Sequence, residues 1–410
     1  MTSPSPPLPL APFAIARLPR IVFGDGALAG LPNEAAVFGS RALLVTGARS
    51  FRDSPRWAAL HAGLAAAGVA CEDLAVPGEP SPELVDAAVA AFAGKGIAVV
   101  IGIGGGSALD AAKAIAGLLP HGHSVLEHLE GVGPERPYAG PATPLILVPT
   151  TAGTGSEATK NAVLSRSGPD AFKKSFRDEQ LVARVAVVDP ELLTGCPPEV
   201  VAANGMDAFT QLLESYVSIK ANPLTDALAW SGMEAFRDGF FAAYRGGDGE
   251  AARAGRSRMA YAALLSGICL AQTGLGSVHG LASPLGAHFP IPHGVCCGTL
   301  VADATRINVR ALRERAPGSE ALAKYALVGA LLTDPPRTGS DDGRNEDAAD
   351  GLADRLADWT ERLALPRLAA FGVGEAHMSR IVAESRGSSM KTNPVVLTDA
   401  EIEALVRARL

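Results

Sequence analysis

Short apolar runs alternate with amphipathic stretches along the first half of the chain. The runs have the length of strands, and Gly or Pro ends each of them; they cover residues 41–47, 69–76, 96–104, 143–150 and 184–190. Helical patterns, such as 55–68 and 81–96, separate the earlier runs. This alternation predicts an α/β fold with a parallel sheet covered by helices.

The pattern changes close to residue 193. From Val200 onward, strand-like runs become scarce and long helical patterns follow one another. We therefore predict an α/β domain over residues 1–192 and an all-helical domain over residues 193–410.

Three smaller features complete the predicted organisation. Thr398, with Glu401 three residues later, predicts a capping box at the start of the last helix. The proline-rich residues 1–12 predict a loose tail, and the polar, Gly- and Pro-containing residues 333–350 predict an exposed loop.

Composition narrows the class of partner. The chain has 410 residues and a net charge of −7, and its acidic and basic residues are interspersed. This distribution argues against a nucleic-acid surface and against a polybasic membrane patch, so a small molecule is the expected partner. No apolar run reaches the length of a membrane-spanning helix, and the N-terminus does not resemble a signal peptide. The five cysteines form no CxxC pair, which favours a reducing, cytoplasmic location: Cys71, Cys196, Cys269, Cys296 and Cys297.

A glycine run follows the apolar strand that ends at residue 104. Gly104, Gly105 and Gly106 permit a close approach of backbone, and a helix is predicted to begin near Ser107. Exposed amides at such a helix N-terminus attract a phosphate, so the run is a candidate pyrophosphate cradle. The spacing is not GxGxxG, and an ordinary tight turn between strand and helix is the alternative.

A second loop, residues 148–165, follows the next strand. It gathers small hydroxyl residues between glycines: Thr150, Thr151, Thr154, Ser156 and Thr159. Hydroxyls and amides at the carboxyl ends of parallel strands commonly bind ligands. Two such loops in one sheet favour a nucleotide over two unrelated turns.

The helical half carries candidate metal ligands. In GMDAFTQLLESY (205–216), Asp207 and Gln211 lie one helical turn apart on the same face. His279 and His293 are fourteen residues apart, and the intervening prolines and glycines allow the chain to turn back. Taken alone, each pattern is also compatible with hydrogen-bonded core residues.

Together these segments resemble the iron-containing (group III) alcohol dehydrogenase family, whose fold also houses glycerol dehydrogenase and dehydroquinate synthase. The motifs occur in the family's order along nearly the whole chain: IVFGDGAL (21–28), VPGEPSP (76–82), GGGSALDAAK (104–113), PTTAGTGSEAT (149–159), VVDPELLTGCPP (187–198), GMDAF (205–209), HGLASPLG (279–286), PHG (292–294) and MKTNP (390–394). The resemblance implies a Rossmann-like N-terminal domain, a helical C-terminal domain, and a cleft that holds a nicotinamide cofactor and a divalent metal.

The resemblance also implies roles for individual residues. Gly104, Gly105, Ser107 and Asp110, beside Gly106, would cradle the cofactor diphosphate. The adenosine and nicotinamide-ribose side would be lined by Thr150, Thr151, Thr154 and Ser156, with Lys173 or its neighbour Lys174 reaching the ribose. Three family metal-ligand positions are matched by Asp207, His279 and His293.

Two positions depart from the family pattern. Gln211 stands where the family usually has a fourth ligand, a histidine, and Ser283 stands where many members have the histidine associated with proton relay. Three ligands suffice for a catalytic site, and glycerol dehydrogenases with an Asp, His, His set take zinc, so the metal is predicted as iron or zinc. Gln211 is then a weak fourth ligand or a hydrogen-bond partner, and the proton comes by way of the cofactor ribose, Ser283 or water.

The end of the first predicted strand bears on the choice of cofactor. NAD-preferring relatives usually carry Asp where this chain has Gly47, and Arg49 and Arg52 follow. A carboxylate there would repel a 2′-phosphate, whereas arginines accommodate it, so the sequence favours NADP over NAD.

The implied function is NAD(P)-dependent, metal-assisted hydride transfer between nicotinamide and a small alcohol or aldehyde. A metal-independent reductase resembling the maleylacetate reductases, a lyase resembling dehydroquinate synthase and a non-catalytic nucleotide-binding protein are the alternatives. The resemblance further implies a homodimer or larger homo-oligomer.

Overall fold

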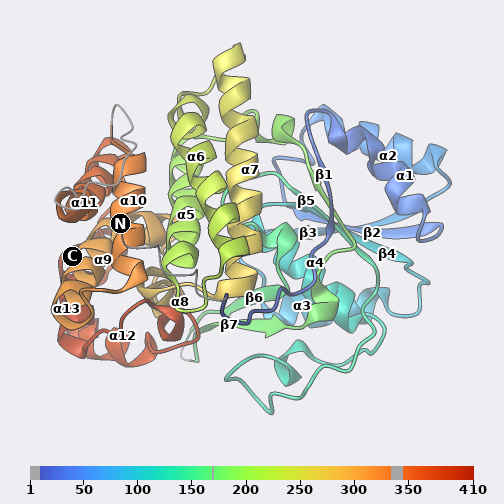
Figure 1. Ribbon diagram of the computed structural model, residues 1–410. Helices are drawn as coiled ribbons and strands as arrows, with labels where there is room; N and C mark the ends of the chain where they lie inside the picture. The colour runs from blue at the N-terminus through green and yellow to red at the C-terminus, as the bar shows by residue number, and fades with distance from the viewer. Residues whose placement is uncertain (1–9, 169, 334–344) are drawn as a thin grey trace.

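The computed structural model describes residues 10–168, 170–333 and 345–410. A parallel six-stranded sheet forms the first half of the chain (Figure 1). Its strands lie in the order β1 (Arg20–Phe23), β8 (Val185–Val188), β5 (Leu145–Pro149), β4 (Val99–Gly104), β2 (Arg41–Gly47) and β3 (Ala70–Val76). All five predicted strands are confirmed, and β1 adds a sixth at one edge.

Alternate residues of the strands feed two separate apolar layers. On β2, Leu43 and Val45 pack on one face with α3 (Pro82–Phe92) and α4 (Gly106–Leu118). Leu44, on the other face, packs with α1 (Leu31–Ala36) and α2 (Pro55–Ala66). Because helices cover both faces, the central strands are apolar throughout, as parallel sheets require. The predicted α/β class is confirmed.

An antiparallel hairpin follows the hydroxyl-rich loop and was missed by the sequence prediction. It consists of β6 (Asn161–Arg166) and β7 (Phe172–Arg177). The prediction of a loop over 148–165 is wrong for its last five residues. Half of the residues of β6 are polar, so the strand lacks the long apolar run by which the other strands were recognised. The hairpin packs against α4 and α8 (Figure 1).

The second half is helical, also as predicted. Its helices are α5 (Pro198–Val217), α6 (Pro223–Arg245), α7 (Glu250–Thr273), α8 (Ser277–His288), α9 (His293–Arg315), α10 (Glu320–Leu331), α11 (Asn345–Arg362), α12 (Met378–Glu384) and α13 (Asp399–Arg407). Helices α5, α6 and α7 stand side by side between the sheet and the remaining helices (Figure 1). The predicted domain boundary near residue 193 falls between β8 and α5.

Helix α5 lies at the centre of this half. Every residue from Gly205 to Val217 is buried, so the helix has no solvated face over that stretch. Phe209 packs against Phe236 and Trp359, which come from α6 and α11. Polar residues on such a helix must find partners inside the protein.

The structure also bears on the smaller predictions. The capping box of Thr398 and Glu401 is confirmed at the start of α13. The predicted loop over 333–350 is wrong for its last six residues, which begin α11, while 334–344 lie outside the described residues. Of the predicted tail, 1–9 lie outside the description and 10–12 are exposed without regular structure. No single described helix is long and apolar enough to cross a membrane; only α7 and α8, as a pair bent by 98°, meet that criterion.

Candidate active site

A cleft of about 590 Å³ lies between the two halves of the chain and is lined by residues of both. It is lined by most of the residues predicted to bind cofactor or metal, namely Gly105, Gly106, Ser107, Asp110, Thr151, Thr154, Ser156, Lys173, Asp207, Gln211, His279, Ser283 and His293. The structure therefore brings residues from five separate sequence motifs to one place. Gly47, Gly104 and Thr150 adjoin the cleft without lining it.

The glycine run ends β4 and opens α4. Gly104 has φ +156°, and a Cβ there would lie 2.7 Å from the Cβ of Ala108, so only glycine fits. Its carbonyl accepts a hydrogen bond from Thr150 N–H at 2.9 Å, which joins the two nucleotide loops. Because α4 begins at Gly106, its free N-terminal amides face the cleft, an arrangement suited to a phosphate.

Asp110 holds this loop assembly together. Its carboxylate accepts hydrogen bonds from Ser156 Oγ at 2.5 Å and from Val163 N–H at 3.1 Å, and it lies 3.0 Å from Lys113 Nζ. Lys113 is fully buried, and this burial lowers its pKa although Asp110 opposes the shift. Both oxygens of Asp110 are thus engaged within the protein, so its first role is to fix α4 against the second loop and β6.

The hydroxyl-rich loop rests directly on the helical half. Gly155 has φ +60°, and a Cβ there would lie 2.4 Å from the Cα of Gly267 on α7, so backbone touches backbone. Ser266 Oγ on α7 also lies 3.3 Å from Gly153 O. The loop that would hold the cofactor is therefore fixed to α7, which packs in turn against α5, the helix that carries Asp207.

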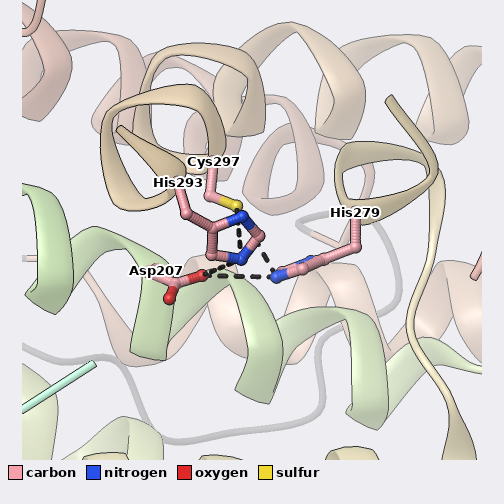
Figure 2. Close-up of side chains that lie close together, drawn as sticks. All are labelled: Asp207, His279, His293 and Cys297. Carbon is pink, nitrogen blue, oxygen red and sulfur yellow. Dashed lines mark hydrogen bonds and ion pairs between the residues drawn. The ribbon is translucent and has the colours of Figure 1, made fainter. Parts of the chain in front are cut away.

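Four potential metal ligands converge at the base of the cleft (Figure 2). Asp207 comes from α5, His279 from α8, and His293 and Cys297 from α9. Asp207 Oδ1 lies 3.3 Å from His279 Nε2 and 3.7 Å from His293 Nε2. The sulfur of Cys297 lies 3.6 and 3.8 Å from the same two nitrogens.

Two glycines allow these helices to approach so closely. A Cβ on Gly276, just before α8, would lie 2.8 Å from Glu214 Oε1. A Cβ on Gly294, the second residue of α9, would lie 2.5 Å from Ala203 O on α5. Side chains at these positions would push His279 and His293 away from Asp207, which explains the glycine in the PHG motif.

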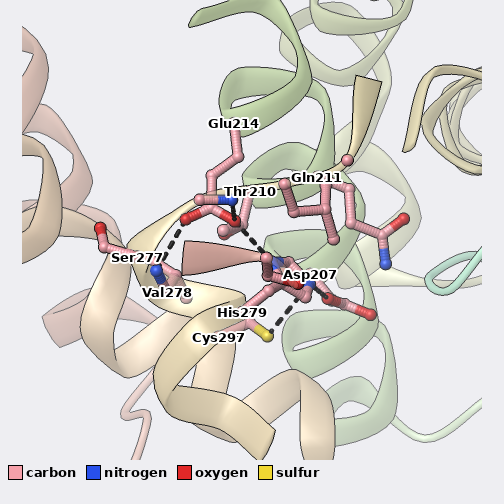
Figure 3. Close-up of polar contacts among 12 residues, drawn as sticks. Asp207, Thr210, Gln211, Glu214, Ser277, Val278, His279 and Cys297 are labelled. Carbon is pink, nitrogen blue, oxygen red and sulfur yellow. Dashed lines mark hydrogen bonds and ion pairs between the residues drawn. The ribbon is translucent and has the colours of Figure 1, made fainter. Parts of the chain in front are cut away.

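Glu214 fixes the orientation of His279 (Figure 3). Its carboxylate accepts hydrogen bonds from Gly276 N–H at 2.9 Å, Val278 N–H at 2.7 Å and His279 Nδ1 at 2.7 Å. Glu214 therefore holds a proton of His279 at Nδ1, and Nε2, which faces the ligand cluster, is the nitrogen that a metal would bind. A carboxylate behind a histidine is the usual support of a metal ligand.

Burial and charge shift the pKa values of the cluster. Burial lowers the pKa of His293 to about 4 and raises the pKa of the Cys297 thiol to about 12. Burial opposes a charged His279, but contacts with Cys297, Asp207 and Glu214 raise its pKa well above the usual value. Although burial also opposes a charged Asp207, His293 and His279 hold the pKa of Asp207 below its usual value.

A divalent cation fits this cluster. Asp207 Oδ2 is buried and has no hydrogen-bond partner among the described residues. A buried carboxylate oxygen without a partner carries a large desolvation cost, which a bound cation removes. Asp207, His279 and His293 supply the oxygen and imidazole donors that zinc and iron accept.

Gln211 and Ser283 have partners of their own. Gln211 Oε1 accepts a hydrogen bond from Ser266 Oγ at 2.8 Å, and Figure 3 shows its amide on the far side of Asp207 from Cys297. Ser283 Oγ donates to Lys173 O at 3.3 Å. The ammonium of Lys173 lies 3.0 Å from Glu79 Oε2.

The end of β2 is open at the predicted cofactor position. A Cβ on Gly47 would meet no atom within 4 Å. Arg49 is exposed, whereas Arg52 donates to Thr46 Oγ1 at 2.6 Å and stacks 4.6 Å from the Trp57 ring centroid. Of the two arginines, Arg49 is the one free of such contacts among the described residues.

Sequence reasoning missed two residues of this site. Cys297 lies four residues after His293 and Glu214 seven after Asp207, which are spacings of a shared helix face. The same spacing rule that paired Asp207 with Gln211 would have found both residues.

Comparison with known proteins agrees with this architecture. The profile described as "Iron-containing alcohol dehydrogenase" matches residues 19–190, and "Fe-containing alcohol dehydrogenase family, C-terminal" matches residues 201–410. Alcohol dehydrogenase 4 of Saccharomyces cerevisiae is 36% identical over 263 residues, 63% of this chain and 66% of the yeast protein. The chain thus spans just under two thirds of that relative.

Longer matches extend the likeness. The probable alcohol dehydrogenase EutG of Salmonella typhimurium is 32% identical over 95% of this chain and 93% of its own. Among solved structures, a 1,3-propanediol oxidoreductase is 27% identical and superposes with a TM-score of 0.86, covering 98% of this chain and 100% of its own.

Proposed function

Because the chain belongs to the iron-containing alcohol dehydrogenase family, we propose that it is an NAD(P)-dependent alcohol dehydrogenase or aldehyde reductase acting on a small alcohol or aldehyde. The observation that carries the proposal is the single cleft in which both nucleotide loops meet Asp207, His279 and His293. A reduced nicotinamide would supply the hydride, and a divalent ion would supply Lewis acidity toward the carbonyl oxygen.

The protein's own part in the reaction is binding and orientation. Gly105, Gly106 and the amides of α4 are placed to hold a diphosphate, while Thr151 and Thr154 line the adjoining wall. The Gly155–Gly267 contact fixes this wall to α7, which packs against α5, so a cofactor bound at the wall would be held in a fixed position relative to Asp207.

In the reductive direction, the hydride adds to the carbonyl carbon and one proton adds to the oxygen, while the nicotinamide is oxidised. Ser283 lines the cleft and its hydroxyl is held by Lys173 O. We propose that water is the source of that proton, either directly or by way of Ser283 Oγ, which would take a proton from water as it gives one up. Asp207 and His293 are the residues whose loss should abolish the reaction.

The cluster favours the metal-assisted reaction over the metal-independent alternative. Asp207 is fully buried, and one of its carboxylate oxygens has no hydrogen-bond partner among the described residues. A buried carboxylate oxygen without a partner is costly, so its presence favours a site that binds a cation. Two of the three basic residues of β7 are paired with acids, Lys173 with Glu79 and Arg177 with Glu130. So few unpaired cations do not favour a lyase that must bind a phosphate-bearing substrate.

NADP is our proposed preference between the two nicotinamide cofactors. The open space at Gly47 and the exposed Arg49 leave room and positive charge for a 2′-phosphate. We also propose a homo-oligomer and a cytoplasmic protein; the five free cysteines support the second.

Absorbance of reduced nicotinamide, followed with a panel of aldehydes, tests the proposal. The metal-free protein is assayed alone, with zinc and with ferrous iron, and with each cofactor. We expect oxidation of NADPH that depends on added metal and falls at least about a hundredfold in Asp207→Ala. Full activity in the presence of a chelator would favour the metal-independent reductase, and silence under every condition would contradict the enzyme.

A further inference from the structure

We propose that Cys297 is the fourth protein ligand of the metal, in place of the ligand that Gln211 does not supply. The inference rests on the proposed metal-assisted function and adds to it the donor set and the class of metal. The site would then be bound by one carboxylate, two imidazoles and one thiolate.

The geometry of the cluster carries the inference. With Zn–N and Zn–O bonds of about 2.0–2.1 Å and a Zn–S bond of about 2.3 Å, a tetrahedral ion separates N from O by about 3.3 Å and N from S by about 3.5 Å. The observed N to O separations are 3.3 and 3.7 Å, and the N to S separations are 3.6 and 3.8 Å. These four separations are close to what one such ion requires, and all four ligand atoms lie within 4.8 Å of one another.

Backbone placement supports the same assignment. Cys297 follows His293 by one turn of α9, so one rigid element presents both donors to the cluster. The thiol is fully buried and has no contact with solvent. Gln211, the residue at the family's usual fourth position, turns its oxygen to Ser266 on α7 instead. The fourth ligand would therefore come from α9 in this chain, and not from α5 as in the usual family pattern.

The donor set has a chemical consequence. Thiolate is a soft ligand, and with two imidazoles it favours zinc, or cobalt as its spectroscopic substitute, over ferrous iron. On binding, the S–H bond breaks, a metal–sulfur bond forms, and one proton leaves to solvent. With four protein donors, the ion would supply Lewis acidity by accepting a fifth ligand, an expansion that catalytic zinc sites allow.

Cobalt spectroscopy of the whole chain tests the assignment. Cys296 provides a matched control because it is the adjacent residue, is equally buried and lies outside the ligand cluster. We expect the unaltered protein and Cys296→Ser to show the thiolate-to-cobalt charge-transfer band in the near ultraviolet. Cys297→Ser should lose the band and bind cobalt at least about tenfold more weakly, while Asp207 and the two histidines still bind it.

A second measurement keeps the test independent of how the variant folds. X-ray absorption at the zinc edge of the unaltered protein should show one sulfur at about 2.3 Å. Retention of the band in Cys297→Ser, or zinc surrounded by nitrogen and oxygen only, would overturn the role of Cys297 while leaving the dehydrogenase proposal standing. Failure of the unaltered protein to bind cobalt or zinc at all would overturn both.

Discussion

Replacement of Glu214 by glutamine tests the support of the metal site without touching the ligand cluster itself. Glu214 Oε2 accepts from Gly276 N–H and His279 Nδ1, and Oε1 accepts from Val278 N–H. The amide of glutamine has only one acceptor. Its NH2 group must therefore face at least one of these three donors.

The magnitude follows from the contacts. Loss of one hydrogen bond to a charged acceptor removes about 1.5–3 kcal/mol, and the donor left buried without a partner costs about 1–3 kcal/mol more. We expect Glu214→Gln to lower the free energy of unfolding by about 3–5 kcal/mol, a large share of the usual stability of a domain. Because His279 is then less firmly oriented, metal affinity should fall about 10- to 100-fold.

Two measurements separate these effects. Urea unfolding of the metal-free protein gives the stability change, and cobalt titration at a temperature where the variant is folded gives the affinity change. Glu250→Gln, an exposed glutamate at the start of α7, makes the same atomic change on the surface and should alter neither quantity appreciably. Unchanged cobalt affinity in a folded Glu214→Gln protein would refute the claim that Glu214 positions His279.

Three further changes test other parts of the molecule. Gly47→Asp, with Gly47→Asn as its control, should shift the NADPH to NADH ratio of kcat/KM at least about tenfold toward NADH; an unchanged ratio would remove β2 from cofactor choice. In Gly294→Ala the new Cβ would lie 2.5 Å from Ala203 O, so the variant should be less stable by about 1–3 kcal/mol and should bind cobalt more weakly. Unchanged stability and unchanged cobalt affinity would show that α9 can shift freely. Burial raises the pKa of Glu157 to about 7, so the folded protein keeps a proton that the unfolded chain loses above about pH 4.5, and stability falls between these pH values. The free energy of unfolding of Glu157→Gln should therefore rise by up to about 3 kcal/mol relative to that of the unaltered protein as the pH rises from 4.5 to 7. Urea unfolding measures both proteins across this range, and an equal change of stability with pH in the two would contradict the prediction.

The fold was predictable where local pattern and burial agree. The central strands β4 and β5 are apolar throughout because helices cover both faces of the sheet, and such runs stand out in a sequence. The hairpin of β6 and β7 did not stand out, because only alternate residues of β6 are buried and because β7 carries three basic residues. Only the tertiary contact with α4 and α8 makes these segments strands.

The candidate site was predictable as a set of motifs but not as a set of contacts. Asp207, His279 and His293 could be identified by their order along the chain, and the structure brings them together. The hydrogen bonds from Ser156 and Val163 to Asp110 depend on how two loops pack together in space. Residue spacing along the sequence does not predict such contacts. Cys297 was not predicted because the five cysteines form no CxxC pair, the spacing that usually indicates a metal-binding thiolate.

Helix α5 shows why the metal is expected at Asp207 and not elsewhere on the same face. Asp207, Gln211 and Glu214 lie four and then three residues apart on a stretch where every residue is buried, so each needs a partner inside the protein. Gln211 finds Ser266, and Glu214 finds two amides and His279. Asp207 alone keeps a buried charged oxygen without a described partner, a cost of at least about 1–3 kcal/mol. Two imidazoles and a thiol converge on this same carboxylate, so a cation bound there would offset part of that cost and would complete the proposed site.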